Sequence, residues 1–167
     1  MDEINASEAT QMKNPTAVER KSGRELVVTR SVNGPAHLVF EAWTKAELFR
    51  RWWVPKSFAV NLLSCDLDVR VGGGYRLVFS HEGSTMEFFG TYLEVTPNSR
   101  LVWTNEEGDG GTTVTTVTFD ESDGRTRLVV HDLYPSTEAL DAAVASGSTG
   151  GLPEQLDALD ELLPSLE

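Results

Sequence analysis

The segment from Leu152 to Leu163 limits the fold more than any other part of the chain. Its leucines recur at spacings of three and four residues, which places them on one face of an α-helix. Most of its acidic residues fall on the opposite face, Pro153 suits the first turn, and Pro164 ends the run. Burial of such a face contributes roughly 1.5–3 kcal/mol per leucine, so this helix must pack against a large apolar surface. Residues 24–134 are the part of the chain that can supply it.

Residues 24–134 show the alternating pattern of β-strands joined by short turns. We predict strands at 24–32, 59–68, 75–80, 86–95, 101–105, 112–119 and 125–133. Two short helices, beginning near Pro35 and at Lys45, follow the first strand, and a weaker helix over 136–145 precedes the last one. Consecutive strands with short turns form antiparallel sheets. We therefore predict an α+β fold, with a curved antiparallel sheet of about six to seven strands wrapped around a long C-terminal helix.

Length and composition predict one domain and exclude several classes of partner. Residues 1–22 are polar and lack periodicity, so we interpret them as a flexible tail before a single domain over 23–167. The formal net charge of −12 argues against nucleic acid or an anionic membrane as a partner. There is one cysteine, no sign of a signal peptide and no apolar run long enough to span a membrane. We expect a soluble, cytoplasmic protein.

Four segments resemble one protein family. They are VFEAWT at 39–44 with LFRRWW at 48–53, DLDVRVGGGY at 66–75, GTYLEVTP at 90–97 with RLVWT at 100–104, and TRLVVH at 126–131. Over about residues 24–164 the chain resembles the helix-grip (START-like, SRPBCC) superfamily. Within it, the chain is similar to the family named after the activator of the heat-shock chaperone ATPase. The resemblance implies an apolar cavity between the sheet and the C-terminal helix.

Two departures from this family limit what the resemblance implies. The family often begins its last helix with Gly-Trp, whereas Gly151 is followed here by Leu152. An aromatic residue at the cavity mouth is therefore absent, and no ligand contact is carried over from it. The separate chaperone-binding domain of the eukaryotic activator has no counterpart in this sequence.

Apolar side chains predicted to face the helix are the candidates for a binding site. We predict a cavity of roughly 300–1,000 Å³ that binds a small hydrophobic molecule. The residues predicted to line it are Trp52, Trp53, Tyr75, Phe79, Phe89, Trp103, Val117, His131 and Leu156. His131 is included because it shares its strand parity with Val129 and Leu133. Core packing is the alternative for the tryptophans, and a hydrogen-bonded core position is the alternative for His131.

The predicted strand over 86–95 is apolar on both faces. Phe89, Leu93 and Val95 share the parity predicted to face the helix, and Met86, Phe88 and Tyr92 occupy the other one. Either the outer face of the sheet meets a second copy of the chain in a homodimer, or the assigned parity is inverted.

Other kinds of chemistry have little support in the sequence. The histidines and carboxylates lack metal-ligand spacing, the glycines at 72–74 lack the helix and lysine of a phosphate loop, and Cys65 lacks a histidine partner. We predict no catalytic residue, no metal and no cofactor. Two alternatives remain open. One is a chaperone-activator-like interaction module with a filled cavity. The other is a polyketide-cyclase-type enzyme, which needs a convergent acid/base pair inside the cavity.

Overall fold

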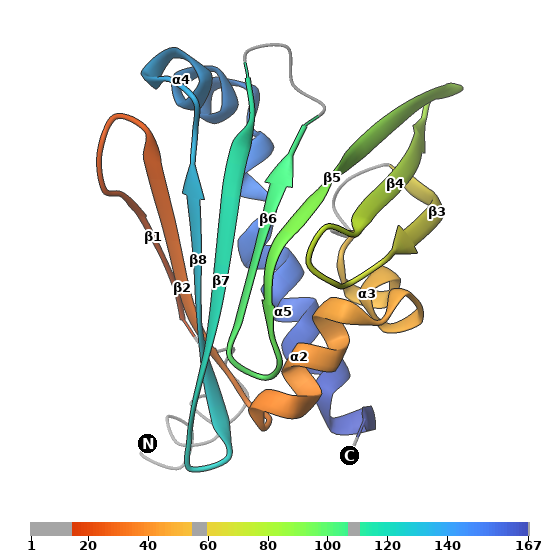
Figure 1. The fold of residues 1–167 in the computed structure, drawn as a ribbon, viewed down its shortest axis with the longest axis vertical. Coiled ribbons are helices and arrows are strands. Elements are labelled where there is room, and N and C mark those ends of the chain that lie inside the picture. Colours follow the sequence, from red (N-terminus) through yellow and green to blue (C-terminus); the bar gives the residue numbers. More distant parts are fainter. Residues whose placement is uncertain (1–14, 55–59, 107–110, 167) are drawn as a thin grey trace, which may run out of the picture.

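The protein consists of one antiparallel sheet with helices packed against its concave side (Figure 1). The computed structural model describes residues 15–54, 60–106 and 111–166. Its strand order is β1-β2-β8-β7-β6-β5-β4-β3. The strands are β1 (Thr16–Arg20), β2 (Glu25–Val32), β3 (Asn61–Leu67), β4 (Gly74–His81), β5 (Ser84–Thr96), β6 (Arg100–Asn105), β7 (Thr113–Ser122) and β8 (Arg125–Leu133). The predicted antiparallel α+β fold is confirmed, with eight strands instead of six or seven.

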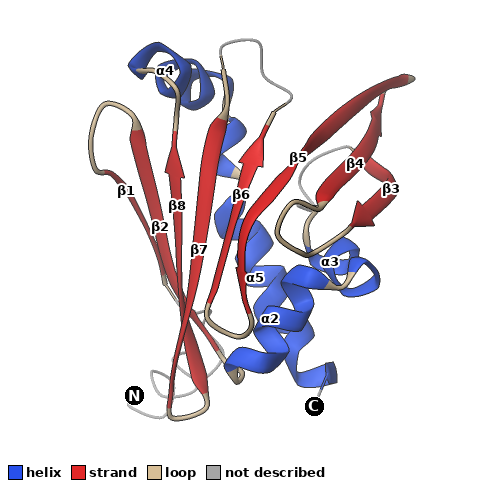
Figure 2. Ribbon diagram, in the orientation of Figure 1, coloured by secondary structure: helices blue, strands red, loops and turns tan. Residues whose placement is uncertain are grey.

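Four α-helices accompany this sheet in the described ranges (Figure 2). They are α2 (Ala36–Thr44), α3 (Ala46–Trp52), α4 (Thr137–Ser146) and α5 (Leu152–Leu162). Short 3-10 turns follow the last two, η1 (Ser148–Gly150) and η2 (Leu163–Leu166). None of the helices in the described part of the chain is long and apolar enough to cross a membrane.

The leucine face of α5 packs as its spacing predicts. Leu156, Leu159, Leu162 and Leu163 are buried, and they join one core cluster with residues of β2, β7, β8, α2 and α3. Figure 1 shows α5 running along the sheet on the side that also carries α2 and α3. The regular helix ends at Leu162, next to the predicted boundary, and Pro164 lies in the turn that follows.

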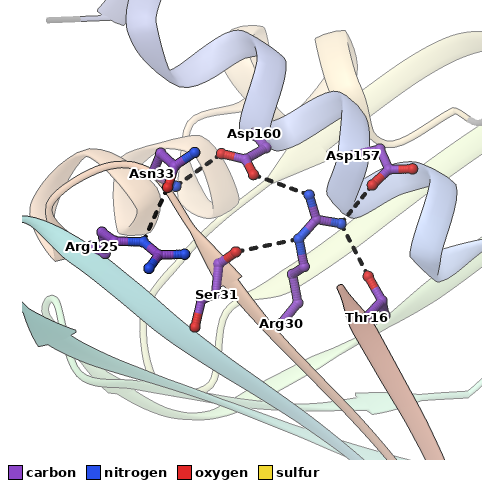
Figure 3. A network of polar contacts seen from close by, with 7 residues as sticks. All are labelled: Thr16, Arg30, Ser31, Asn33, Arg125, Asp157 and Asp160. Carbon is purple, nitrogen blue, oxygen red and sulfur yellow. Dashed lines mark hydrogen bonds and ion pairs between the residues drawn. The ribbon is translucent and has the colours of Figure 1, made fainter. Parts of the chain in front are cut away.

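The acidic face of α5 is held by a buried arginine, which the sequence analysis did not predict. Arg30 of β2 is 1% exposed. Its guanidinium donates to Asp157 Oδ1 at 2.6 Å and to Asp160 Oδ2 at 3.0 Å (Figure 3). It also donates to Thr16 Oγ1 at 3.0 Å, and the backbone N–H of Asn33 donates to Asp160 Oδ1 at 2.8 Å. These contacts fix α5 to β2 beyond its leucine packing.

Strand β1 corrects the interpretation of residues 1–22 as a tail. Thr16–Arg20 pairs antiparallel with β2, Thr16 opposite Arg30 and Arg20 opposite Leu26, and forms one edge of the sheet. Residues 1–14 of the predicted tail lie outside the described residues. The added strand accounts for the higher strand count.

The parity assigned to the strand over 86–95 is wrong for most of its length. Phe88 packs edge-on against the buried Phe79, with ring centroids 5.4 Å apart, and Tyr92 is buried. Phe88 pairs with the buried Leu77, whereas Phe89 pairs with Arg76 and lies on the opposite face. Exposure alone does not separate the two faces, because Phe88 and Phe89 are each 38% exposed and Leu93 is 48% exposed. A register shift between Tyr92 and Glu94 then returns Val95 to the core. Inverted parity is therefore the correct alternative for Phe88 and Tyr92. Met86, Phe88, Phe89 and Leu93 are nevertheless each 38–48% exposed, so the homodimer stays a prediction.

Candidate functional site

A cavity of about 450 Å³ lies between the sheet and the start of α5. Its described lining residues are Leu26, Val28, Trp43, Trp53, Phe88, Trp103, Asn105, Thr113, Thr115, Val130, Asp132, Tyr134, Ala143, Thr149, Leu152 and Gln155. A smaller space of about 90 Å³ shares several of these residues and reaches Tyr75 and Tyr92. The larger volume falls within the range of roughly 300–1,000 Å³ found for small-molecule sites.

Three tryptophans form the apolar wall of this cavity. The ring of Trp43 lies 5.9 Å from that of Trp53 and 5.8 Å from that of Trp103, measured between centroids. Trp53 in turn stacks on Phe49 at 4.6 Å. The Nε1 of Trp43 is buried and has no hydrogen-bond partner among the described residues. Aromatic pairs at such distances hold one another rigidly, so this wall is preformed.

A chain of hydrogen bonds crosses the polar part of the wall. The Tyr75 hydroxyl donates to Asn105 Oδ1 at 2.8 Å, and Trp103 Nε1 donates to the same oxygen at 3.3 Å. Asn105 Nδ2 donates to Thr115 Oγ1 at 2.9 Å. The Thr115 hydroxyl donates onward to Asp132 Oδ1 at 2.5 Å. Asn105 Nδ2 also donates to the carbonyl oxygen of Thr113 at 3.2 Å. Along the chain itself, each donor lies farther from Asp132 than its acceptor, so these bonds run toward the carboxylate.

Asp132 is the only charged side chain among the described residues that line the cavity. Burial raises its pKa, because a desolvated carboxylate is less stable than a carboxylic acid. The hydrogen bond from Thr115 and the nearby His131 act in the opposite direction but do not cancel this effect. Burial likewise raises the pKa of Tyr134 to about 12. A carboxyl group in an apolar wall, with a pKa raised by burial, is the strongest candidate for a functional group in this site.

Of the nine predicted site residues, the structure brings Trp53 and Trp103 to the cavity and Tyr75 to the smaller space beside it. Four others are buried in the core, Trp52, Phe79, Val117 and Leu156. Trp52, for example, donates its Nε1–H to the carbonyl oxygen of Ala42 at 3.0 Å. For Trp52 this is the core-packing alternative. Phe79, Val117 and Leu156 were predicted to line the cavity and lie in the core instead.

Phe89 and His131 lie on the outer side of the sheet. Phe89 lines an open groove with charged residues of β3 and β4. His131 Nε2 lies 2.9 Å from Glu25 Oε2, and this hydrogen bond lowers the pKa of Glu25. The prediction that His131 points into the cavity is therefore wrong, because Leu128 and Val130 have the inward parity of β8.

A sequence model for the family described as "Activator of Hsp90 ATPase homolog 1-like protein" matches residues 33–164. The chain belongs to this family. The match covers every element from α2 to α5, and therefore most of the cavity wall. The resemblance stated from four short segments is confirmed.

Solved structures similar to this chain share its fold. A protein from Rhodobacter sphaeroides is 24% identical with a TM-score of 0.83, over 90% of this chain and 99% of that one. One from Nitrosomonas europaea is 24% identical with a TM-score of 0.78, over 87% and 97%. One from Mycobacterium smegmatis is 20% identical with a TM-score of 0.79, over 89% and 97%. A search of the curated proteins finds no match.

In this Hsp90-activator-like fold, Leu152 follows Gly151 where the family often has a tryptophan, and this leucine lines the cavity. Leu152, at the start of α5, contributes to the wall beside Gln155. The side-chain amide of Gln155 donates to the carbonyl oxygen of Trp53 and ties α5 to the end of α3. A leucine fills less space than a tryptophan, which leaves room at this end of the cavity.

Sequence reasoning missed Trp43, Phe88, Asn105, Thr115 and Asp132 as lining residues. For Asp132 the sequence does contain a signal. Arg125 and Arg127 share the parity of His131, and arginines mark a solvated face more often than a buried one. The opposite parity, which carries Asp132, is therefore the inward one. Within the described ranges, no group of three or more histidine, cysteine or acidic residues is arranged to hold a metal ion.

The raised pKa of Asp132 predicts how stability depends on pH. Between its ordinary pKa of 3.8 and its raised value, the folded protein holds this proton more tightly than the unfolded chain does. Stability therefore falls as pH rises through that interval. Asp132→Asn keeps an oxygen acceptor for Thr115 and removes the charge, so it should raise the Tm at neutral pH and change it little below about pH 4. Thermal unfolding followed by circular dichroism across this range tests the prediction. A Tm difference that does not grow with pH would contradict it.

Proposed function

We propose that the protein binds a small hydrophobic molecule in the cavity between its sheet and α5. The observation that carries this proposal is a space of about 450 Å³ next to a rigid wall of three tryptophans. Well-packed interiors leave few voids larger than a water molecule. A space of this size, with a few convergent polar groups, is the usual form of a ligand site.

The cavity supports ligand binding over the two other functions considered. An interaction module of the chaperone-activator type needs no internal space. A cyclase-type enzyme needs a convergent acid/base pair, and Asp132 and Tyr134 are the titratable side chains among the described lining residues. With a pKa of about 12, Tyr134 retains its proton at neutral pH and is a poor base. Binding therefore requires fewer assumptions than catalysis.

Filling the cavity from α4 should weaken binding. Ala143 lines the cavity, so Ala143→Phe would place a ring inside it. We expect at least about tenfold weaker binding of N-phenyl-1-naphthylamine, a neutral hydrophobic probe, in a fluorescence titration. The adjacent Val144 is 46% exposed, so Val144→Phe adds the same ring outside the cavity and serves as the control. Equal affinities in the two variants would contradict the assignment of the site.

Native mass spectrometry of the protein as purified tests the same proposal without a chosen probe. A bound molecule would appear as extra mass in the native spectrum and would be released by denaturing extraction. We expect its loss in Ala143→Phe and its retention in Val144→Phe. Retention in both variants would place the molecule elsewhere on the protein.

A further inference from the structure

We propose that the ligand of this cavity is a hydrophobic amine, whose ammonium group pairs with the carboxylate of Asp132. This inference rests on the proposed function and adds the chemical class of the ligand. It follows from the charges, the hydrogen bonds and the aromatic groups of the cavity wall.

The negative charge of Asp132 in the cavity wall argues against anionic ligands. No lysine, arginine or histidine is among the described residues of the wall, whereas Asp132 is. A fatty acid or a phosphate ester would bring a second negative charge into a largely apolar wall that already holds Asp132. Like charges repel strongly at low dielectric, and a buried anion without a partner is costly. The ligand is therefore neutral or positively charged.

The hydrogen bonds of the wall leave acceptor sites on the carboxylate of Asp132 that a ligand donor can fill. Thr115 is the only hydrogen-bond donor that the described residues provide to Asp132. The bonds from Tyr75 through Asn105 and Thr115 all run in this direction, so the chain ends at a carboxylate with unused lone pairs. An ionised carboxylate has about four acceptor sites, and an ammonium carries up to three donors. A bound ammonium would also favour the ionised form of Asp132, which burial alone disfavours.

The aromatic wall suits a cation as well as an apolar group. Tryptophan attracts cations through the negative face of its ring, more strongly than tyrosine or phenylalanine does. Trp43, Trp53 and Trp103 line the same cavity as Asp132. The net charge of −12 also concentrates cations around the protein and speeds their approach. The combination of one carboxylate with several indoles distinguishes an amine from a neutral alcohol of the same size.

Three probes that share one skeleton test this inference. They are 2-(1-naphthyl)ethylamine, 2-(1-naphthyl)ethanol and 1-naphthylacetate, measured by isothermal titration calorimetry near neutral pH. We expect the amine to bind about tenfold more tightly than the alcohol, and the acetate to bind weakest. An alcohol or acetate that binds as tightly as the amine would overturn the inference and leave hydrophobic binding intact. Failure of these probes and of N-phenyl-1-naphthylamine to bind at all would instead overturn the proposed function.

Asp132→Asn supplies the second measurement. Because the variant keeps the shape of the side chain and an acceptor for Thr115, we expect the amine and the alcohol to bind within about threefold of each other. Asp120→Asn is the matched control, since Asp120 is exposed on β7 and its replacement changes the net charge equally. A preference for the amine that survives in Asp132→Asn, or that is lost equally in Asp120→Asn, would show that Asp132 does not recognise it.

Discussion

Replacement of Arg30 by methionine is expected to lower the free energy of unfolding by about 3–5 kcal/mol. The guanidinium of Arg30 is fully buried and pairs with Asp157 and Asp160, whose side chains are only 23% and 11% exposed. Methionine fills much of the same volume but leaves two carboxylates without their cation. Both carboxylates then lose the buried cation that offsets their desolvation, or α5 must move away from β2 to hydrate them.

Equilibrium unfolding in urea measures this loss, and a surface ion pair provides the control. Arg20 and Asp141 are 2.6 Å apart, but their side chains are 37% and 58% exposed. Arg20→Met should therefore cost no more than about 1 kcal/mol. Adding Asp157→Asn and Asp160→Asn to Arg30→Met should restore part of the stability, because no half-buried negative charge then lacks its cation. If Arg30→Met were as mild as Arg20→Met, the buried pair would not hold α5 in place.

The elements of the fold could be predicted because burial of one face of a helix or strand places apolar residues at a regular spacing along the sequence. The leucine spacing of α5 and the alternation in β4 both identified buried faces correctly. Arg30 was missed although Leu26, Val28 and Val32 place it on a buried face, because its carboxylate partners lie about 130 residues further along the chain. Strand β1 was missed for another reason. Its sequence, TAVER, has no apolar periodicity, and it is held as an edge strand by backbone pairing with β2.

The binding site was harder to predict because strands near a cavity are apolar on both faces. In β8, Val129 and Val130 are neighbours of equal polarity, so the choice between His131 and Asp132 depended on the arginines further back in the strand. In β5, Phe88 and Phe89 pose the same problem, and the register shift after Tyr92 changes the parity within one strand. Asn105 and Thr115 join the site through hydrogen bonds between strands, which a pattern along one strand does not reveal.

Gly90→Ala is expected to destabilise the protein by about 3 kcal/mol or more, at or above the usual range for overpacking. Gly90 is buried in β5, opposite Tyr75 of β4. A Cβ atom at this position would lie 2.7 Å from Cε2 of Tyr75 and closer still to the carbonyl oxygen of Thr104 in β6. That oxygen belongs to the backbone, so no side-chain rotation can relieve the clash. A glycine within a strand often marks such a close approach of another backbone.

The same clash should also disturb the cavity, which separates this variant from a merely unstable one. Tyr75 donates to Asn105, the residue that aligns Thr115 and through it Asp132. Displacement of the Tyr75 ring by the new methyl group would break the first of these bonds. Gly150→Ala is the control, because the added Cβ would meet no atom within 4 Å among the described residues beyond its two chain neighbours, and we expect it to keep both stability and probe binding. Chemical denaturation and titration with N-phenyl-1-naphthylamine at low temperature, where the folded fraction is known, measure the two effects. A stable Gly90→Ala variant with unchanged binding would mean that β5 and β6 can separate there at little cost.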